Sequence, residues 1–385
     1  MQIEISHIFV FKSLKMKNYL IILLLLLSFT CISQQRCHTN EYVENLNEKY
    51  PKYQKNRILV NKQTKNWINL NYTKTKNSVI IIPVVVHVIW KNNQENISNQ
   101  QIFSQINVLN ADFRRTNVDA IMTPSVWSNI AADTEIEFCL ATIDPNGAST
   151  SGITRTQTTQ TSFSIQTDAM KSTSTGGIDP WNQNNYLNIW VCNLSGGILG
   201  YATPPVSWNN PDDGVVIGYN YFGTTGTVQG PYNKGRTCTH EVGHWLNLDH
   251  IWGDGSCGND NVNDTPKQEE LNYNCPAFPH NANSCGTSNS SGDMYMNYMD
   301  YTNDGCMNLF TLGQKARMIA AINLYRSNLI SNSCNTTSVV NDNLNNEKKL
   351  VKIIDILGRN RSKFTPAIYL YIYDDNSVEK KIILK

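Results

Sequence analysis

The segment THEVGHWLNLDH at Thr239–His250 predicts a metal site built on one helix. His240 and His244 are four residues apart. An α-helix turns by about 100° per residue, so these two side chains lie on one face, one turn apart, and can bind the same metal ion. Glu241 lies beside them, where its carboxylate can accept a proton from metal-bound water without binding the metal itself.

A third histidine, His250, completes the ligand set only if the helix ends before it. It lies six residues beyond His244, about 240° round a continuous helix, and would point away from the metal. Asn247 lies between them, and asparagine is, after glycine, the residue that best adopts the left-handed conformation that ends a helix. Three histidines and one open position are typical of catalytic zinc. The alternative third ligand is Glu269 or Glu270, in a polar, turn-rich stretch.

Composition argues against a nucleic-acid-binding protein and indicates export. The 385 residues carry a net charge of +1, and 16% of them are charged, which is too balanced for a nucleic-acid-binding surface. An apolar run at 19–29 follows Lys15 and Lys17, so residues 1–33 are predicted to be a signal peptide. Lipidation at Cys31 is the alternative. No other segment is long enough to cross a bilayer.

Export to an oxidising compartment changes the interpretation of the ten cysteines. One leaves with the signal peptide, and the nine that remain are an odd number. Cys37 is isolated near the mature N-terminus, and a free thiolate is a good zinc ligand, whereas an ordinary disulfide is the alternative. Cys139 and Cys192 lie in strand-like runs and could bridge neighbouring strands. Cys238 and Cys334 are left without an assignment.

The pattern of the chain indicates an α+β domain. Residues 34–76 are polar and weakly patterned, which is typical of a segment that buries little core, and we interpret them as a removable pro-segment. Ser98 is expected to cap a helix, with Gln101 in the capping-box position and Ile97 and Ile102 as a hydrophobic staple. Strands are predicted at 79–90, 136–141, 187–193 and 214–221, and helices at 99–115 and 311–329.

The region after His250 is rich in loops. Asp260, Asn263, Asp264 and Thr265 supply hard oxygen ligands within a short span, which suits calcium. Short clusters of Asp, Asn and Gly also form plain turns, and this alternative stays open.

The histidine motif reads HEVGHWLNL at 240–248 and is followed by DTP at 264–266, NYMDY at 297–301 and CMN at 306–308. These segments resemble the pappalysin (cytophagalysin) family of metzincin zinc metalloproteases. The similarity extends from about Val79 to Cys334, and Asn247 departs from the glycine that most metzincins have at this position. The resemblance implies an α+β catalytic domain with a twisted sheet, a backing helix, a zinc helix and a loop-rich C-terminal half.

The resemblance also implies roles for residues outside the zinc motif. Met299 would form the Met-turn, an apolar floor beneath the imidazoles, and Tyr301 would donate to the oxyanion; an ordinary core methionine and a core or surface tyrosine are the alternatives. Cys37 would be the cysteine switch of a zymogen, with its thiolate in the open zinc position. An edge strand within 196–202 would pair with an extended peptide substrate, and a glycine-rich loop is the alternative.

Further features follow from the same resemblance. Calcium would be bound by Asp260, Asn263 and Thr265. A preference for basic residues beside the scissile bond would require an acidic residue near Cys306, and Asp304 and Asp300 are the nearest acids. The implied disulfides are Cys257–Cys285 and Cys275–Cys306.

From about Val340 the composition changes to a polar linker followed by short strand-like runs at 352–359, 369–375 and 378–381. This region resembles the C-terminal sorting domain of type IX secretion substrates, with abbreviated first strands. A small carbohydrate-binding or adhesive β-module is the alternative.

Together these features predict a secreted or cell-surface zinc endopeptidase that is made as a zymogen and acts on proteins or peptides. Its export would use a signal peptide and the type IX machinery. A zinc-binding adhesin without activity and a metal-dependent hydrolase of non-peptide bonds are the alternatives. The predicted organisation is a signal peptide at 1–33, a pro-segment at 34–76, a catalytic domain at 77–336, and a linker with a small β domain at 337–385.

Overall fold

The computed structural model describes residues 36–71, 79–331, 350–355, 359, 367–373 and 378–383. The chain forms two units, Met1–Asn332 and Ser333–Lys385, each with a β-sheet of its own. The predicted signal peptide, Cys31 and Cys334 lie outside the described residues. No helix among the residues described is both long enough and apolar enough to cross a membrane.

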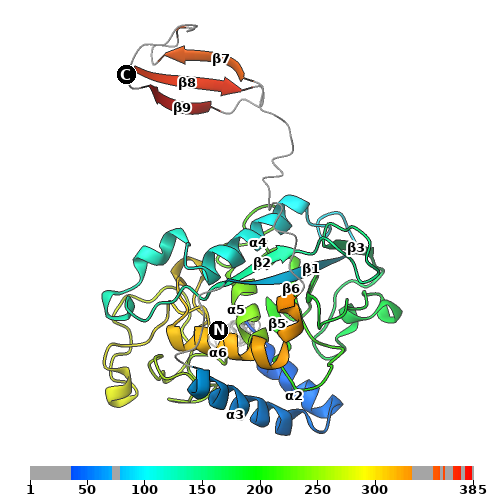
Figure 1. Ribbon diagram of the computed structural model, residues 1–385, viewed down its shortest axis with the longest axis vertical. Helices are drawn as coiled ribbons and strands as arrows, with labels where there is room; N and C mark the ends of the chain where they lie inside the picture. Colours follow the sequence, from blue (N-terminus) through cyan, green and yellow to red (C-terminus); the bar gives the residue numbers. More distant parts are fainter. Residues whose placement is uncertain are drawn as a thin grey trace, which may run out of the picture. The chain divides into compact units, whose positions relative to one another are not determined.

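A six-stranded sheet forms the centre of the first unit (Figure 1). Its order is β2-β1-β4-β6-β5, and β3 also pairs with β1. All pairs are parallel except β5 with β6. The long central strand is almost entirely buried and β-branched, as expected in a parallel sheet covered on both faces. The strands are β1 (Ile80–Trp90), β2 (Ile136–Leu140), β3 (Ile153–Gln157), β4 (Leu187–Cys192), β5 (Gly200–Ala202) and β6 (Val215–Gly218).

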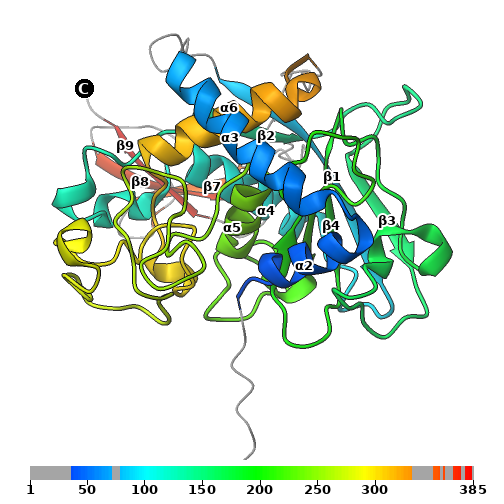
Figure 2. The same ribbon diagram turned by 90° about the horizontal axis from the view of Figure 1, so that it is seen from below.

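Helices cover the two faces of this sheet. On one face, α4 and α5 share a core with alternate residues of β1, β4 and β6. On the other face, the N-terminal helices α2 and α3 pack with Trp190, Tyr201 and Val216. Figure 2 shows α3 running beside α6. The helices are α2 (Thr39–Lys49), α3 (Tyr53–Asn71), α4 (Asn99–Phe113), α5 (Arg236–Trp245) and α6 (Leu312–Tyr325).

Short 3₁₀ turns connect these elements. They are η1 (Val118–Met122), η2 (Ser125–Trp127), η3 (Ala169–Lys171), η4 (Thr173–Thr175), η5 (Tyr219–Tyr221), η6 (Gly286–Asn289), η7 (Asp304–Cys306) and η8 (Ser327–Ser331).

The predicted α+β class is confirmed, and every predicted strand and helix of the catalytic domain is present. β6 and α6 end earlier than predicted and continue as η5 and η8, while β3 was not predicted. Ser98 caps α4 by accepting from Gln101 N at 3.2 Å. The capping box is wrong, because the Gln101 amide donates instead to the carbonyls of Tyr219 and Phe222.

The N-terminal segment is more ordered than its composition predicted. Its two helices bury Tyr42 and Leu46 on α2, and Tyr53 and Val60 on α3. These apolar residues are few, but their spacing places them on one face of each helix. Tyr42, Leu46 and Tyr53 share a buried cluster with residues of β4, β5 and β6. The N-terminal segment by itself would therefore bury little apolar surface.

The cysteines separate into bonded and free. Disulfides join Cys257 to Cys285 and Cys275 to Cys306, the two pairs that the family resemblance implied. A bridge between Cys139 and Cys192 is wrong, because β1 lies between their strands. Cys139 is in a disulfide, whereas Cys37, Cys192 and Cys238 are buried free thiols in the described part of the chain.

The second unit contains an antiparallel sheet of order β7-β8-β9. Each of its strands starts within about two residues of the start of the corresponding predicted run. They are β7 (Leu350–Asp355), β8 (Ala367–Tyr373) and β9 (Val378–Ile383).

A buried carboxylate, Asp112 on α4, ties the sheet-backing helix to the helix that carries the histidines. It accepts from Thr239 Oγ1 at 2.8 Å and from the Tyr298 hydroxyl at 2.9 Å, and it pairs with Arg236 at 3.3 Å. Burial raises its pKa, while Arg236 and the hydrogen bonds lower it.

Replacing Asp112 with alanine is expected to lower the free energy of unfolding by about 2–6 kcal/mol. The buried hydroxyls of Thr239 and Tyr298 would both lose their acceptor, and each unsatisfied buried donor costs about 1–3 kcal/mol. Arg236 would keep Asp119, at 2.7 Å, as its remaining charged partner.

Denaturant unfolding of the purified protein measures this change. Glu269→Ala, at an exposed glutamate, is the control and should unfold like the wild type. A loss below about 1 kcal/mol in Asp112→Ala would contradict the assignment, since that is the range of surface pairs.

Candidate active site

The helix α5 carries His240, Glu241 and His244 and ends as the sequence predicted. Asn247 has φ of 74°, the left-handed conformation. Leu248 N donates to Gly243 O and Asn247 N donates to His244 O, each at 2.9 Å. This pair of bonds is the Schellman pattern that closes a helix and reverses the chain.

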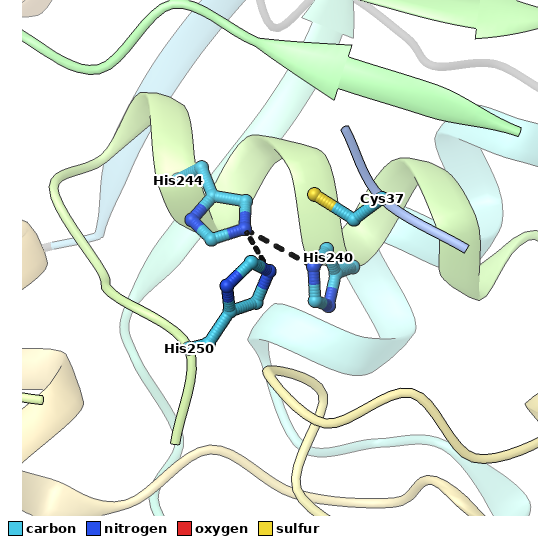
Figure 3. Close-up of side chains that lie close together, drawn as sticks. All are labelled: Cys37, His240, His244 and His250. Carbon is cyan, nitrogen blue, oxygen red and sulfur yellow. Dashed lines mark hydrogen bonds between the residues drawn. The ribbon is translucent and has the colours of Figure 1, made fainter. Parts of the chain in front are cut away.

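The reversed chain brings the third histidine back to the first two (Figure 3). His244 Nε2 lies 3.1 Å from His240 Nε2 and 3.0 Å from His250 Nε2. All three rings are buried. Together with Cys37 they form a group whose candidate ligand atoms all lie within 4.8 Å of one another.

The opposite ring nitrogens determine which atoms face this centre. Each Nδ1 has an oxygen acceptor, which assigns the proton to Nδ1 and leaves a lone pair on Nε2. The three Nε2 lone pairs therefore converge. The acceptors are Tyr298 O for His240 at 2.7 Å, Leu248 O for His244 at 2.8 Å and Asp254 Oδ1 for His250 at 2.6 Å.

This arrangement fits a zinc ion. Burial is the main cause that lowers the pKa of His240, and the neighbouring His244 and His250 lower it further. Burial and the neighbouring His250 lower the pKa of His244 to about 3. Both rings are therefore neutral ligands. The three Nε2 lone pairs point toward one another and repel unless they share a cation. Burial also raises the pKa of the Cys37 thiol, and a coordinated metal ion is what converts such a thiol to thiolate. Three imidazoles and a thiolate form a tetrahedral zinc set.

Glu241 lies at the edge of this cluster and is engaged by the N-terminal segment. Its Oε2 accepts from Thr39 Oγ1 at 2.9 Å and lies 3.5 Å from Cys37 Sγ. Its Oε1 is buried without a hydrogen-bond partner in the described structure. Burial raises the pKa of Glu241 to about 8, although the bonds from Cys37 and Thr39 act in the opposite direction.

The N-terminal segment also occupies the edge of the sheet. Cys37 pairs with Gly200 of β5, and Ala202 N donates to Thr39 Oγ1 at 3.0 Å. The predicted edge strand is therefore a strand at 200–202, preceded by a turn at Gly196 and Gly197 with positive φ. Tyr301 donates from its hydroxyl to Cys37 O at 3.0 Å.

Met299 lies directly against the zinc helix. It is fully buried, and a Cβ added at Gly243 would lie 2.5 Å from its sulfur. Its backbone N–H donates a hydrogen bond to Asn297 Oδ1 at 2.9 Å. Glycine at position 243 thus permits the close approach of the methionine to the helix between the two histidines.

Comparison with known proteins agrees with this geometry. Residues 173–323 match the Peptidase_M43 family, described as pregnancy-associated plasma protein-A. An extracellular metalloprotease of Arthroderma benhamiae is 31% identical over 259 residues, 64% of this chain and 74% of that protein. The chain belongs to the Peptidase_M43 family of metalloproteases.

Other relatives match over different extents. An extracellular metalloprotease of Sordaria macrospora is 40% identical over 148 residues, 37% of this chain and 50% of that protein. The chain thus spans about half the length of this curated relative and of several similar ones. Among solved structures, promirolysin of Tannerella forsythia is 48% identical, with a TM-score of 0.67, and the match covers 77% of this chain and 97% of that one. Mature mirolysin in complex with a cleaved peptide is 52% identical, with a TM-score of 0.62, over 65% of this chain and 97% of that one.

One contact of this Peptidase_M43 site was missed by sequence reasoning. Arg36 is fully buried, pairs with Asp304 Oδ1 at 2.8 Å and donates to Thr302 O at 2.7 Å. Asp300, the other acid considered, is instead bonded by Gln268 and Asn272. The only signal for Arg36 in the sequence is its position beside Cys37.

The predicted calcium ligands are only partly brought together. Asp260 Oδ2 accepts from Thr265 Oγ1 at 2.8 Å, whereas Asn263 is exposed. Asp264 accepts from Thr311 and Gly313 at the start of α6. Protein donors thus reach both aspartates, and calcium stays a prediction.

The alternative third ligands lie elsewhere. Glu269 and Glu270 are exposed, and neither belongs to the cluster of candidate ligands found among the described residues. The structure therefore favours His250.

Proposed function

We propose that this protein is a secreted zinc endopeptidase made as a zymogen, whose N-terminal segment closes the site. The observation that carries this proposal is the convergence of Cys37, three histidines and Glu241 in one buried cluster. Family membership and the similarity to promirolysin support it.

Each side chain has a position suited to its proposed role. His240, His244 and His250 would hold zinc, which supplies a Lewis acid and makes a water molecule more acidic. Glu241 would accept the proton of the attacking water and pass a proton to the leaving amine. Tyr301 would donate to the oxygen of the scissile carbonyl. This role is supported by the hydrogen bond that its hydroxyl donates to the carbonyl of Cys37 at 3.0 Å.

Latency follows from the same contacts. The Cys37 thiolate would occupy the fourth zinc position, and Thr39 already bonds Glu241, the proposed base. The segment also covers the edge of β5, where a peptide substrate would add as a strand. A substrate therefore cannot enter while this segment is seated in the site.

The helix α3 provides a second attachment, remote from the thiol. Arg57 Nη1 donates to Asn247 Oδ1 at 2.8 Å and to Pro205 O at 2.9 Å. Asn247 Nδ2 in turn donates to Thr64 Oγ1 at 3.2 Å. The residue that ends the zinc helix is thus held by two residues of the pro-segment.

Replacing Arg57 with alanine is expected to speed activation by about tenfold or more, because a hydrogen bond to a charged group contributes about 1.5–3 kcal/mol. The mature enzyme is unchanged, since the substitution lies in the segment that is removed. The rate of appearance of the mature N-terminus under trace chymotrypsin measures the effect, because chymotrypsin cuts after aromatic residues and neither substitution removes such a site. Lys55→Ala, on the exposed side of the same helix, is the control, and equal rates for the two variants would contradict the proposal.

Asp304 is proposed to favour basic side chains next to the scissile bond. It is buried and binds Arg36 in the latent state, so departure of that arginine would leave a buried carboxylate without its charged partner. Cleavage of a peptide library by the mature wild-type enzyme is expected to be enriched for Arg or Lys at one position beside the cut. A profile without basic enrichment would remove this part of the proposal.

Export is proposed to use the signal peptide at 1–33 and a type IX sorting domain within 337–385, flanking a pro-segment at 34–76 and a catalytic domain at 77–336. Relatives named extracellular metalloproteases and the two disulfides support an oxidising destination. Deletion of 337–385 should leave the protein in the periplasm of a host with this machinery. Unchanged appearance in the medium would contradict the sorting assignment.

The decisive experiment follows casein cleavage and the N-terminal sequence of the purified secreted chain over time. Casein should be cut only as the Cys37 segment is lost, and a zinc chelator should stop it. An ester panel tests the non-peptide hydrolase alternative. If the trypsin-activated protein does not cleave casein even with added zinc, the adhesin alternative replaces this proposal.

A further inference from the structure

The three proposed zinc ligands differ in the group that accepts a hydrogen bond from Nδ1, the ring nitrogen on the side away from the ligand cluster. His240 and His244 donate from Nδ1 to backbone carbonyls, whereas His250 is bonded by the carboxylate of Asp254, at the shortest distance of the three, 2.6 Å. A carboxylate is a charged acceptor, so this bond is stronger than one to a carbonyl.

The positions of the histidines explain why the third one needs more support. His240 and His244 project from α5, and the helix itself orients them. His250 lies beyond the end of that helix, in an irregular segment just before a turn at 251–254. Its ring is held on its face by Trp252, which stacks at a centroid distance of 4.4 Å and an interplanar angle of 9°.

The loop that follows is shaped to return a carboxylate to this ring. Gly253 N donates to His250 O at 2.8 Å, and Gly253 and Asp254 both have positive φ, 65° and 55°. A Cβ at Gly253 would lie 2.2 Å from Asn259 N, so the loop folds tightly on itself here. A left-handed conformation is uncommon for a residue with a side chain, and such residues persist where surrounding structure demands them.

We infer that Asp254 is a positioning residue for His250. It holds the ring with Nε2 toward the ligand cluster in one tautomer, and its negative charge makes that nitrogen a better zinc ligand. The inference rests on the proposed function, and it extends the site to the loop of residues 252–257.

The test is zinc affinity of the full secreted chain, measured by competition with a chromogenic chelator. Substitution of a group that bonds a ligating histidine typically weakens zinc binding by about 10–100-fold. Asp254→Asn, which keeps an acceptor oxygen without the charge, is expected near the lower figure, and Asp254→Ala near the upper one. The absorption spectrum of the cobalt-substituted protein should change in Asp254→Ala, because His250 is no longer held.

Asp249→Asn is the matched control. Asp249 lies beside His250 in the sequence but bonds Asn261 and Arg317, not the ring, and its variant should bind zinc like the wild type. Thermal unfolding of the chelated proteins shows whether each variant is folded. Wild-type affinity and an unchanged cobalt spectrum in a folded Asp254→Ala would overturn the inference. If the wild type itself binds no zinc, the proposed function fails with it.

Discussion

Replacing Glu241 with alanine is expected to abolish detectable proteolysis while zinc stays bound. Glu241 is fully buried beside the histidine cluster, and its partners are Thr39 and Cys37, both of which would leave with the proposed pro-segment. After their departure, it is the carboxylate best placed to take the proton of an attacking water. General base catalysis contributes about a hundred- to ten-thousand-fold to a rate, so kcat should fall by at least that range.

The measurement compares casein cleavage by the wild type and Glu241→Ala, both activated with trypsin, with zinc content determined on the same samples. Glu269→Ala and Glu270→Ala remove exposed carboxylates from the alternative ligand region and should retain full activity and zinc. Undiminished turnover in Glu241→Ala would contradict the role of Glu241 as the general base. Loss of zinc from the Glu269 or Glu270 variant would instead restore the carboxylate as third ligand.

Replacing Cys37 with alanine is expected to release activity before the N-terminal segment is cut. The thiol is the only atom of that segment in the cluster of candidate metal ligands found within the described part of the chain. Its loss would open the proposed fourth zinc position, although Thr39 and α3 still hold the segment in place. Each 1.4 kcal/mol lost from the closed state is tenfold in the open population, so uncut Cys37→Ala should exceed the uncut wild type by at least about tenfold.

Initial rates on a short quenched peptide, with N-terminal sequencing of each sample, measure this before processing begins. Cys192→Ala is the matched control, because Cys192 is also a buried free thiol but lies in the core of β4. It should stay as latent as the wild type. Equal latency of the Cys37 and Cys192 variants would mean that the thiol does not hold the site closed.

Local patterns accounted for the elements that build the site. The spacing of His240 and His244, and the left-handed Asn247 between them and His250, depend only on helix geometry and on one residue's backbone preference. β1 was predicted because a long β-branched run has few other structures available to it.

Features that depend on a distant partner were less accessible. The helices α2 and α3 were missed because their few apolar side chains are buried only against surfaces supplied by other segments. Gln101 fits a capping box in sequence, yet its amide finds buried carbonyls more than a hundred residues away. The pairing of Cys139 with Cys192 failed because strand order places β1 between them.

The sequence by itself determined the ligand types, their spacing and the turn that lets three histidines converge, because helix periodicity and chain reversal are local properties. Only the tertiary structure decided that Thr39 bonds Glu241, that Arg36 pairs with Asp304 and that the carboxylate of Asp254 returns to His250. The first two contacts join residues more than two hundred positions apart, and they follow from how the whole chain folds, which no local pattern contains. The third joins residues four positions apart, but it needs two successive left-handed residues in a loop that folds back on residues 258–259.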